Sequence, residues 1–125
     1  MKYIHRHIES TLKKLINAFP SLAITGPRQS GKSTLLINTL TNYNYVTLDD
    51  PLIREQALSD PLFLLDSMGE RAIIDEIQLA PQLLSYVKIK IDNNREKKGR
   101  YIFTGSQQFT MIKNLGDSLA GRIAL

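Results

Sequence analysis

Apolar side chains recur along much of this chain with the period of an amphipathic helix. Residues 4–19 place their apolar positions on one helical face, and a proline follows them directly. Residues 33–40 suit a second helix, and residues 81–93 begin with a proline and then carry an apolar stripe. Asp60-Pro61 combines a capping side chain with a first-turn proline, so it predicts the start of another helix.

Short, continuous apolar runs lie between these helical segments and predict buried strands. The four runs cover residues 22–25, 45–48, 71–75 and 100–104. Because strands and helices alternate, we expect an α/β fold class in which helices flank a parallel sheet. Residues 1–125 are expected to form one domain, with residues 1–20 as its N-terminal helix.

Composition narrows the classes of protein to which the chain can belong. Its 125 residues contain no apolar run of the roughly 20 residues that a membrane span needs, and no signal peptide. The absence of cysteine excludes disulfide frameworks, zinc ribbons, iron–sulfur clusters and thiol nucleophiles. His5 and His7 point to different sides of a helix and lack a third ligand, so they predict no metal site. The expected location is the cytoplasm.

The charge balance favours acidic partners. Sixteen Lys and Arg residues against twelve Asp and Glu give a formal net charge of +4, which suits phosphates or nucleic acid. Four of the basic residues, Arg95, Lys97, Lys98 and Arg100, cluster near a glycine. Such a cluster is typical of a solvated turn between two elements, and a contact with nucleic acid is the alternative.

The strongest chemical signal follows the first predicted strand. Residues 26–33 read GPRQSGKS and match the phosphate-loop pattern G-x-x-x-x-G-K-[ST] without a mismatch. In such a loop the backbone N–H groups and the positive end of the next helix cradle phosphate oxygens. We expect Lys32 to reach the β- and γ-phosphates and the Ser33 hydroxyl to ligate Mg²⁺. The predicted nucleotide-binding residues are Gly26, Pro27, Arg28, Gln29, Ser30, Gly31, Lys32, Ser33 and Thr34.

Two neighbouring carboxylates, Asp75 and Glu76, end the third predicted strand. In P-loop folds such a strand neighbours the first strand and holds an aspartate beside the metal. We therefore expect Asp75 to accept a Mg²⁺-bound water and Glu76 to polarise the attacking water as a general base. The competing pair, Asp49-Asp50, is expected to cap the turn before Pro51, with a metal-side contact as the alternative.

Polar residues also follow the fourth predicted strand. If that strand lies beside the P-loop strand, Thr104, Ser106 or Gln107 could touch the γ-phosphate or the lytic water. The alternative is that Gly105-Ser106 forms a turn. Near the end of the chain, Arg122 is a candidate for neutralising transition-state charge, although a lone arginine is usually a surface residue.

With these residues in place, the chain resembles a family of bacterial and archaeal AAA+-type P-loop ATPases. The matching segments, in the expected order, are GPRQSGKST at 26–34, LDDP at 48–51, AIIDEIQLAP at 72–81, YIFTGSQ at 101–107 and SLAGR at 118–122. The resemblance implies a RecA-like ATPase core with an added catalytic glutamate, ATP rather than GTP as the nucleotide, and the sheet order 5-1-4-3-2.

The resemblance also implies roles for single residues. Lys32 and Ser33 are carried over as the nucleotide and Mg²⁺ contacts. Asp75 is carried over as the Walker B acid and Glu76 as the catalytic glutamate.

Two further roles rest on the resemblance alone. Ser106 and Gln107 match the sensor position, and Arg122 matches the arginine of the family's GR motif, a finger acting on a neighbouring subunit. Family members continue past that motif into a C-terminal domain, whereas this chain ends at Leu125. We therefore expect a truncated ATPase that lacks the fifth strand, leaves residues 22–24 as an open apolar edge, and has its missing C-terminal half or another protein as a partner.

The leading functional prediction is an ATPase domain that hydrolyses ATP to ADP and phosphate with Mg²⁺. The first alternative is a nucleotide-binding or partner-binding fragment without significant turnover. A small-molecule kinase would need an arginine-rich lid, and the sequence after Ser106 offers one arginine, Arg122. A DNA helicase would need a second motor lobe, for which one domain of this length has no room.

Overall fold

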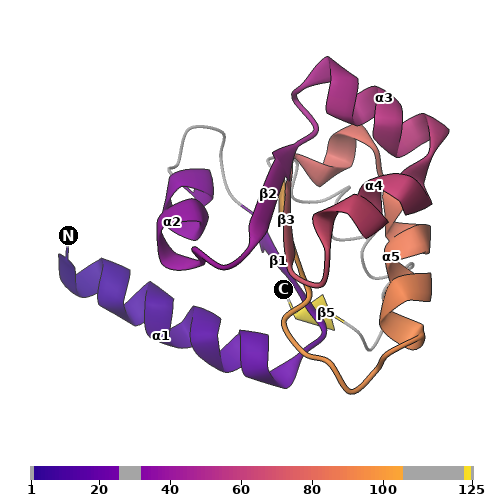
Figure 1. Cartoon of the computed structure of the whole chain (residues 1–125). Helices are drawn as coiled ribbons and strands as arrows, with labels where there is room; N and C mark the ends of the chain where they lie inside the picture. Colours follow the sequence, from indigo (N-terminus) through magenta and orange to yellow (C-terminus); the bar gives the residue numbers. More distant parts are fainter. Residues whose placement is uncertain (1, 26–31, 106–122, 125) are drawn as a thin grey trace.

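The computed structural model describes residues 2–25, 32–105 and 123–124 (Figure 1). Within these ranges, five parallel strands form one sheet in the order β2-β3-β4-β1-β5. The strands are β1 Ser21–Thr25, β2 Asn44–Thr47, β3 Ala72–Asp75, β4 Tyr101–Gly105 and β5 Ile123–Ala124. The helices are α1 Lys2–Ala18, α2 Lys32–Thr39, α3 Pro51–Ser59, α4 Pro61–Met68, the 3₁₀ helix η1 Ile77–Leu79, and α5 Leu83–Asp92. The predicted α/β fold class is confirmed.

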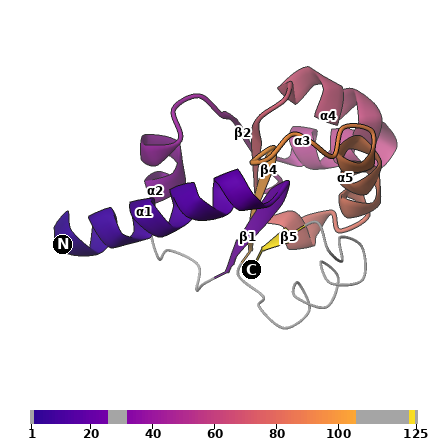
Figure 2. The ribbon, with the colours of Figure 1, turned by 90° about the horizontal axis from the view of Figure 1, so that it is seen from below.

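The helices cover both faces of the sheet. Helices α1 and α2 lie on one face, and α3, α4 and α5 lie on the other (Figure 2). The helices and the sheet therefore form three layers, and the central strands are shielded from water on both sides.

No helix in the described part of the chain is long and apolar enough to cross a membrane.

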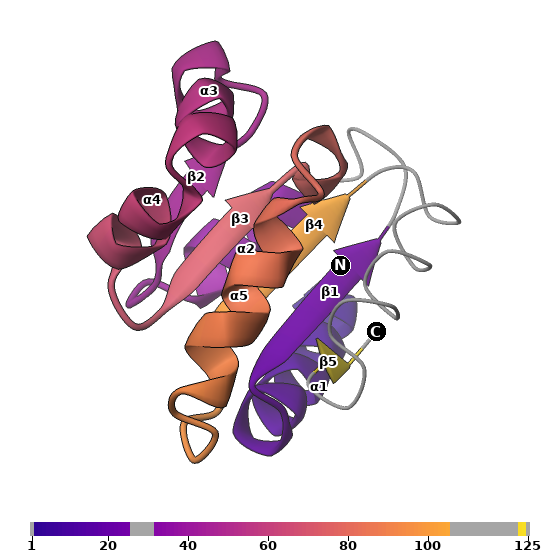
Figure 3. The same ribbon diagram turned by 90° about the vertical axis from the view of Figure 1, so that its right-hand side faces the viewer.

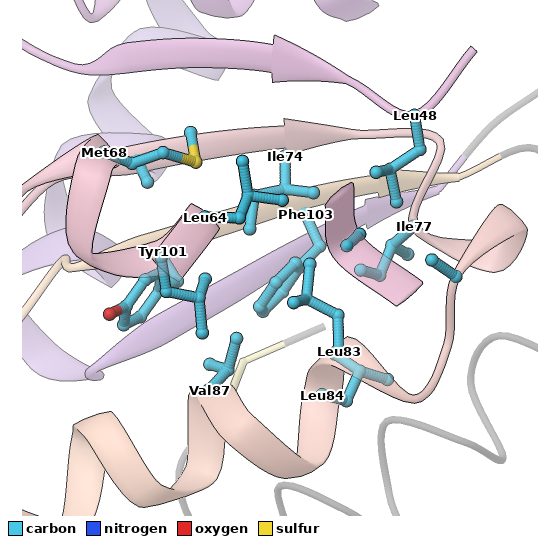
Figure 4. Close-up of a cluster of buried hydrophobic side chains, with 14 of the residues drawn as sticks. Leu48, Leu64, Met68, Ile74, Ile77, Leu83, Leu84, Val87, Tyr101 and Phe103 are labelled. Atoms are coloured by element: carbon cyan, nitrogen blue, oxygen red, sulfur yellow. The ribbon is translucent and has the colours of Figure 1, made fainter. Parts of the chain in front are cut away.

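Successive residues of the central strands supply two separate cores. Ile73 and Ile102 pack on the face covered by α1 and α2. Ile74 and Phe103, one position further along the same strands, pack on the opposite face with side chains from α4, η1 and α5 (Figure 4). Because neighbouring strand residues point to opposite faces, a strand buried on both faces must be apolar at almost every position. This requirement explains the continuous apolar runs in the sequence.

The strand order corrects one prediction and confirms another. The prediction that the strand ending at Asp75 neighbours the P-loop strand is wrong, because β4 lies between β3 and β1. The order implied by the family resemblance, 5-1-4-3-2, is confirmed. The strand pairing β1–β4 also meets the condition set for Thr104, since Ile24 lies opposite Thr104 in the register.

The prediction that the fifth strand is lacking is wrong. Ile123 and Ala124 pair in parallel with Ser21 and Leu22, on the side of β1 away from β4. The first two residues of β1 are therefore covered on both edges. A two-residue strand is too short to show the alternation that identifies strands in a sequence, which is why the sequence pattern did not predict it.

Two aspartates begin the pair of helices that follows β2. The Asp50 carboxylate accepts a hydrogen bond from Leu52 N–H at 2.9 Å, and Pro51 occupies the first turn of α3. Asp60 accepts from Phe63 N–H at 3.3 Å and begins α4, as predicted. Asp50 thus caps a helix that the sequence analysis did not predict, because its short, mixed sequence lacks a clear apolar stripe.

The turn before β4 packs tightly against the end of α1. Gly99 has a φ of +64°, and its N–H donates to the Phe19 carbonyl oxygen at 2.8 Å. The Tyr43 hydroxyl donates to the Gly99 carbonyl oxygen. A Cβ atom at position 99 would overlap Ile16 Cγ2 and lie 3.0 Å from the Ile16 carbonyl oxygen. Glycine is therefore required here both for its backbone conformation and for space.

Replacing Gly99 by alanine is expected to destabilise the fold by more than the backbone strain of an alanine at positive φ would. Gly69→Ala is the matched control, because Gly69 also has a positive φ, of +76°, while the nearest atom to its added Cβ is 3.6 Å away. We expect Gly99→Ala to lower the free energy of unfolding by at least about 1 kcal/mol more than Gly69→Ala, since overpacking adds to the strain. Urea denaturation measures both, and equal losses would contradict the packing described here.

Candidate functional site

The acidic residues singled out in the sequence lie where the central strands end. Asp75 is the last residue of β3, Glu76 follows it, and Thr104 lies near the end of β4. Figure 3 shows the arrowheads of β1, β3 and β4 at the same edge of the sheet. In open parallel sheets, ligands bind outside this carboxyl edge.

A single hydroxyl links the two acidic residues to the neighbouring strand. Thr104 Oγ1 donates a hydrogen bond to Asp75 Oδ1 and accepts one from Glu76 N–H at 3.1 Å. Thr104 has no exposed surface, while Asp75 and Glu76 keep 7% and 4% of theirs. Because the hydroxyl acts as donor on one side and acceptor on the other, it fixes the carboxylate of one residue and the backbone of the next.

A tyrosine from the edge strand holds the other oxygen of the same carboxylate. The Tyr45 hydroxyl, on β2, donates to Asp75 Oδ2 at 2.7 Å. Strands β2 and β3 pair so that Tyr45 lies opposite Ile73, two positions before Asp75, within the diagonal reach of an aromatic side chain. Both oxygens of Asp75 are therefore oriented by hydroxyl groups from the strands on either side.

Glu76 has a strained backbone at the point where the chain leaves the sheet. Its φ and ψ of 60° and 50° are left-handed, and no other non-glycine residue in the described ranges has a positive φ. This conformation costs about 1–2 kcal/mol for a residue with a Cβ atom. Gln78 Nε2 donates to Glu76 Oε2 at 2.5 Å, so the side chain is held as well. Strain of this kind is concentrated at functional sites.

A strand precedes the phosphate-loop sequence and a helix follows it, as expected. Strand β1 ends at Thr25 and α2 begins at Lys32. Thr25 lies opposite Gly105 on β4, so β1 ends one strand away from the acidic pair. Several predicted site residues lie outside the described residues: Gly26, Pro27, Arg28, Gln29, Ser30, Gly31, Ser106, Gln107 and Arg122, together with the side chains of Lys32, Ser33 and Thr34.

One predicted contact has a different role in the structure. Thr104 is fully buried, and its hydroxyl is engaged by Asp75 and Glu76 rather than directed at a nucleotide. Sequence reasoning also missed Tyr45 and Gln78. Gln78 lies only two residues after Glu76, so the sequence offers a weak local signal for their contact. The contact of Tyr45 with Asp75 depends on the β2–β3 register, which the sequence does not show.

The oxygen-rich edge fits a magnesium ion that is bound together with phosphates. Asp75 offers a carboxylate, the ligand type that Mg²⁺ prefers. Among the described residues, no three His, Cys, Asp or Glu side chains come together as a metal cage. Mg²⁺ usually uses one or two protein carboxylates and completes its shell with water and substrate phosphates, and this donor set suits that arrangement.

The sheet order, the buried acidic pair at the end of β3 and the phosphate-loop sequence after β1 define a domain of the AAA+ P-loop ATPase class. The sequence profile of a family described as an AAA domain matches residues 18–125. The chain belongs to this AAA domain family and is a nucleotide-binding domain of the ATPase type.

Similar proteins extend well beyond the matched region. Two uncharacterized proteins, from Mycobacterium bovis and Mycobacterium tuberculosis, are each 28% identical to this chain over 122 residues, which cover 96% of it. The chain spans 27% of the length of each relative. The structure of C. elegans PCH-2 is similar with a TM-score of 0.56 at 16% identity, over 98% of this chain and 40% of PCH-2. At that identity the similarity shows the fold alone.

Replacing Thr104 by valine should disturb both acidic residues. Valine has nearly the same shape but leaves the buried Glu76 N–H without its acceptor, so we expect a loss of about 1–3 kcal/mol in the free energy of unfolding. Hydrogen exchange at the Glu76 amide should speed up in the same variant. Thr104→Ser keeps the hydroxyl and should preserve slow exchange. Unchanged exchange in Thr104→Val would contradict the bridging role.

Proposed function

We propose that this domain binds ATP with Mg²⁺ and hydrolyses it to ADP and phosphate. The observation that carries the proposal is the buried pair Asp75 and Glu76, fixed by Thr104 at the carboxyl edge of the sheet. Strand β1 ends at the same edge and continues into the sequence GPRQSGKS. A phosphate-binding loop and two oriented carboxylates at one edge are the parts that ATP hydrolysis requires.

Burial makes the two successive carboxylates costly to keep at this edge for structural reasons alone. Each buried, ionised carboxylate has a desolvation cost of several kcal/mol unless opposite charge or hydrogen bonds compensate for it. Hydrogen bonds from Thr104 and Tyr45 offset part of this cost at Asp75. A functional role for the pair is therefore part of the proposal.

The proposed roles follow from position and chemistry. Asp75 would help to hold Mg²⁺, and the ion, when bound, would neutralise charge on the phosphates. Glu76 orients the attacking water and takes its proton. Its backbone conformation and its hydrogen bond from Gln78 restrict the position of the carboxylate before the substrate binds. Lys32 and the backbone N–H groups at the start of α2 stabilise the negative charge on the transferred phosphoryl group.

Three further residues complete the proposed site on the strength of the family pattern. Ser106 and Gln107 follow β4 directly and are proposed as the sensor of the γ-phosphate. Arg122 is proposed as a finger that acts on the nucleotide of a neighbouring subunit. ATP is proposed over GTP on the same family resemblance.

Replacing Glu76 by glutamine should stop hydrolysis and leave binding intact. Glutamine has the same shape but cannot accept a proton, so we expect the rate of Mg²⁺-dependent ATP hydrolysis to fall by roughly 10² to 10⁴. The affinity for a fluorescent ATP analogue, measured in the same buffer, should stay within about threefold of the wild-type value.

Two controls make the result decisive. Glu55→Gln removes the same charge from an exposed position on α3 and should leave the rate unchanged. Lys32→Ala should lose nucleotide binding as well as hydrolysis. A wild-type rate no higher than that of Glu76→Gln, with binding retained, would support a nucleotide-binding domain without turnover and contradict the proposed activity.

A further inference from the structure

The amino edge of the sheet, opposite the nucleotide site, has a basic pocket. The pocket has a volume of about 200 Å³ and is lined by Glu70, Arg71, Lys97, Lys98 and Arg100. Figure 3 shows the turn between α5 and β4 at the end of the sheet away from the arrowheads. At 3.3 Å per residue, the four steps along the chain from Arg71 to Asp75 separate the two edges by about 13 Å.

The strand register places two arginines side by side. Arg71 and Arg100 directly precede β3 and β4, and these strands pair with Ala72 opposite Tyr101. The Ala72 N–H donates to the Arg100 carbonyl oxygen at 2.8 Å. Two cationic side chains on adjacent strands repel each other, and the nearby Glu70 carboxylate, which interacts with both arginines, offsets part of that repulsion.

Both arginines are held in place by aromatic rings. The Arg100 guanidinium lies 5.2 Å from the Tyr101 ring centroid and donates from Nη1 to the Lys90 carbonyl oxygen at 2.7 Å. The Arg71 guanidinium lies 5.7 Å from the Tyr43 ring centroid. Because these contacts restrict the side chains before any ligand arrives, less conformational entropy is lost on binding.

Positive charge exceeds negative charge within the pocket. Four of the five lining side chains are cationic, and the single carboxylate, Glu70, forms an ion pair with Lys97. The hydrogen bond from Lys97 lowers the pKa of Glu70, so this carboxylate stays ionised and competes with any incoming anion. Elsewhere on the same turn, Arg95 pairs with Asp92 and does not line the pocket.

The size and the lining of the pocket indicate an inorganic or ester phosphate rather than a larger ligand. Pockets that enclose small organic molecules are usually about 300–1,000 Å³ and mostly apolar. This pocket is smaller, and all of its lining residues are charged. The planar guanidinium group of an arginine can donate two parallel hydrogen bonds to two oxygens of one phosphate.

We propose that this basic pocket binds a phosphate group, with Arg71, Lys98 and Arg100 as its ligands and Glu70 as a competitor for Lys97. The phosphate can belong to a free phosphate compound or to the backbone of a nucleic acid strand. The site is separate from the nucleotide site and does not depend on the proposed ATPase activity.

The first test uses inorganic phosphate and amide NMR shifts, which report binding near each residue. We expect phosphate to shift the amides of Gly99 and Ala72, and the double variant Arg71→Gln/Lys98→Gln to weaken that binding at least about tenfold. Glu70→Gln should tighten phosphate binding about twofold to fivefold, because the exposed carboxylate that competes for Lys97 is removed. The matched control Lys88→Gln/Arg95→Gln removes the same charge outside the pocket and should leave the affinity unchanged.

The second test separates the two sources of phosphate. A fluorescein-labelled single-stranded DNA of twelve nucleotides is titrated at several salt concentrations. If the backbone of a nucleic acid is the ligand, DNA should bind and the Arg71→Gln/Lys98→Gln variant should reduce the salt slope by about 1.4, at about 0.7 per lost contact. Binding of phosphate without DNA would assign the pocket to a free phosphate compound. Binding of neither probe, or equal losses in the control variant, would overturn the proposal.

Discussion

The hydroxyl of Thr104 is the contact on which the acidic edge of this protein depends. The backbone pairing of β3 with β4 extends to Ile74 and Phe103, and beyond it Glu76 N–H bonds to a side chain instead of a carbonyl. Because a side-chain oxygen takes the place of a backbone acceptor here, the chain can leave the sheet at Glu76 in a left-handed conformation and enter η1 directly. A buried N–H without a partner would cost about 1–3 kcal/mol, an amount comparable to the strain of the turn.

The short central strands connect two chemically opposite edges. Strands β3 and β4 begin directly after Arg71 and Arg100, and Asp75 and Thr104 lie at or next to their other ends. The residues between them are apolar and fully buried on both faces, so neither edge can shift without disturbing both cores. Negative charge at the carboxyl edge suits a metal-bound nucleotide, whereas positive charge at the amino edge suits a phosphate of another molecule.

Much of this architecture could be predicted from the sequence because it depends on local patterns. The helical period before Pro20, the apolar strands and the Asp60-Pro61 cap each follow from side chains a few residues apart. The phosphate-loop pattern predicted a strand before it and a helix after it, and β1 and α2 occupy these positions. These features need no knowledge of which strands are neighbours.

The features that escaped prediction depend on contacts between distant segments. Tyr45 reaches Asp75 only because β2 pairs with β3 in one register, and the burial of Thr104 requires β4 to lie beside β3. The position of β3 relative to the P-loop strand and the two-residue β5 are likewise set by tertiary pairing. Spacing along the chain carries no information on such contacts, so the sequence left Thr104 as one of three residues that could touch the nucleotide and did not indicate its link to Asp75 and Glu76.

The proposed function requires Asp75 to couple magnesium to the nucleotide. The most direct test compares ATP affinity with Mg²⁺ and with EDTA in the wild-type protein, in Asp75→Asn and in the exposed control Asp66→Asn on α4. We expect Mg²⁺ to tighten ATP binding at least about tenfold in the wild type and the control, and Asp75→Asn to lose most of that gain while its affinity in EDTA stays within about twofold. Full retention of the Mg²⁺ effect in Asp75→Asn would contradict the account.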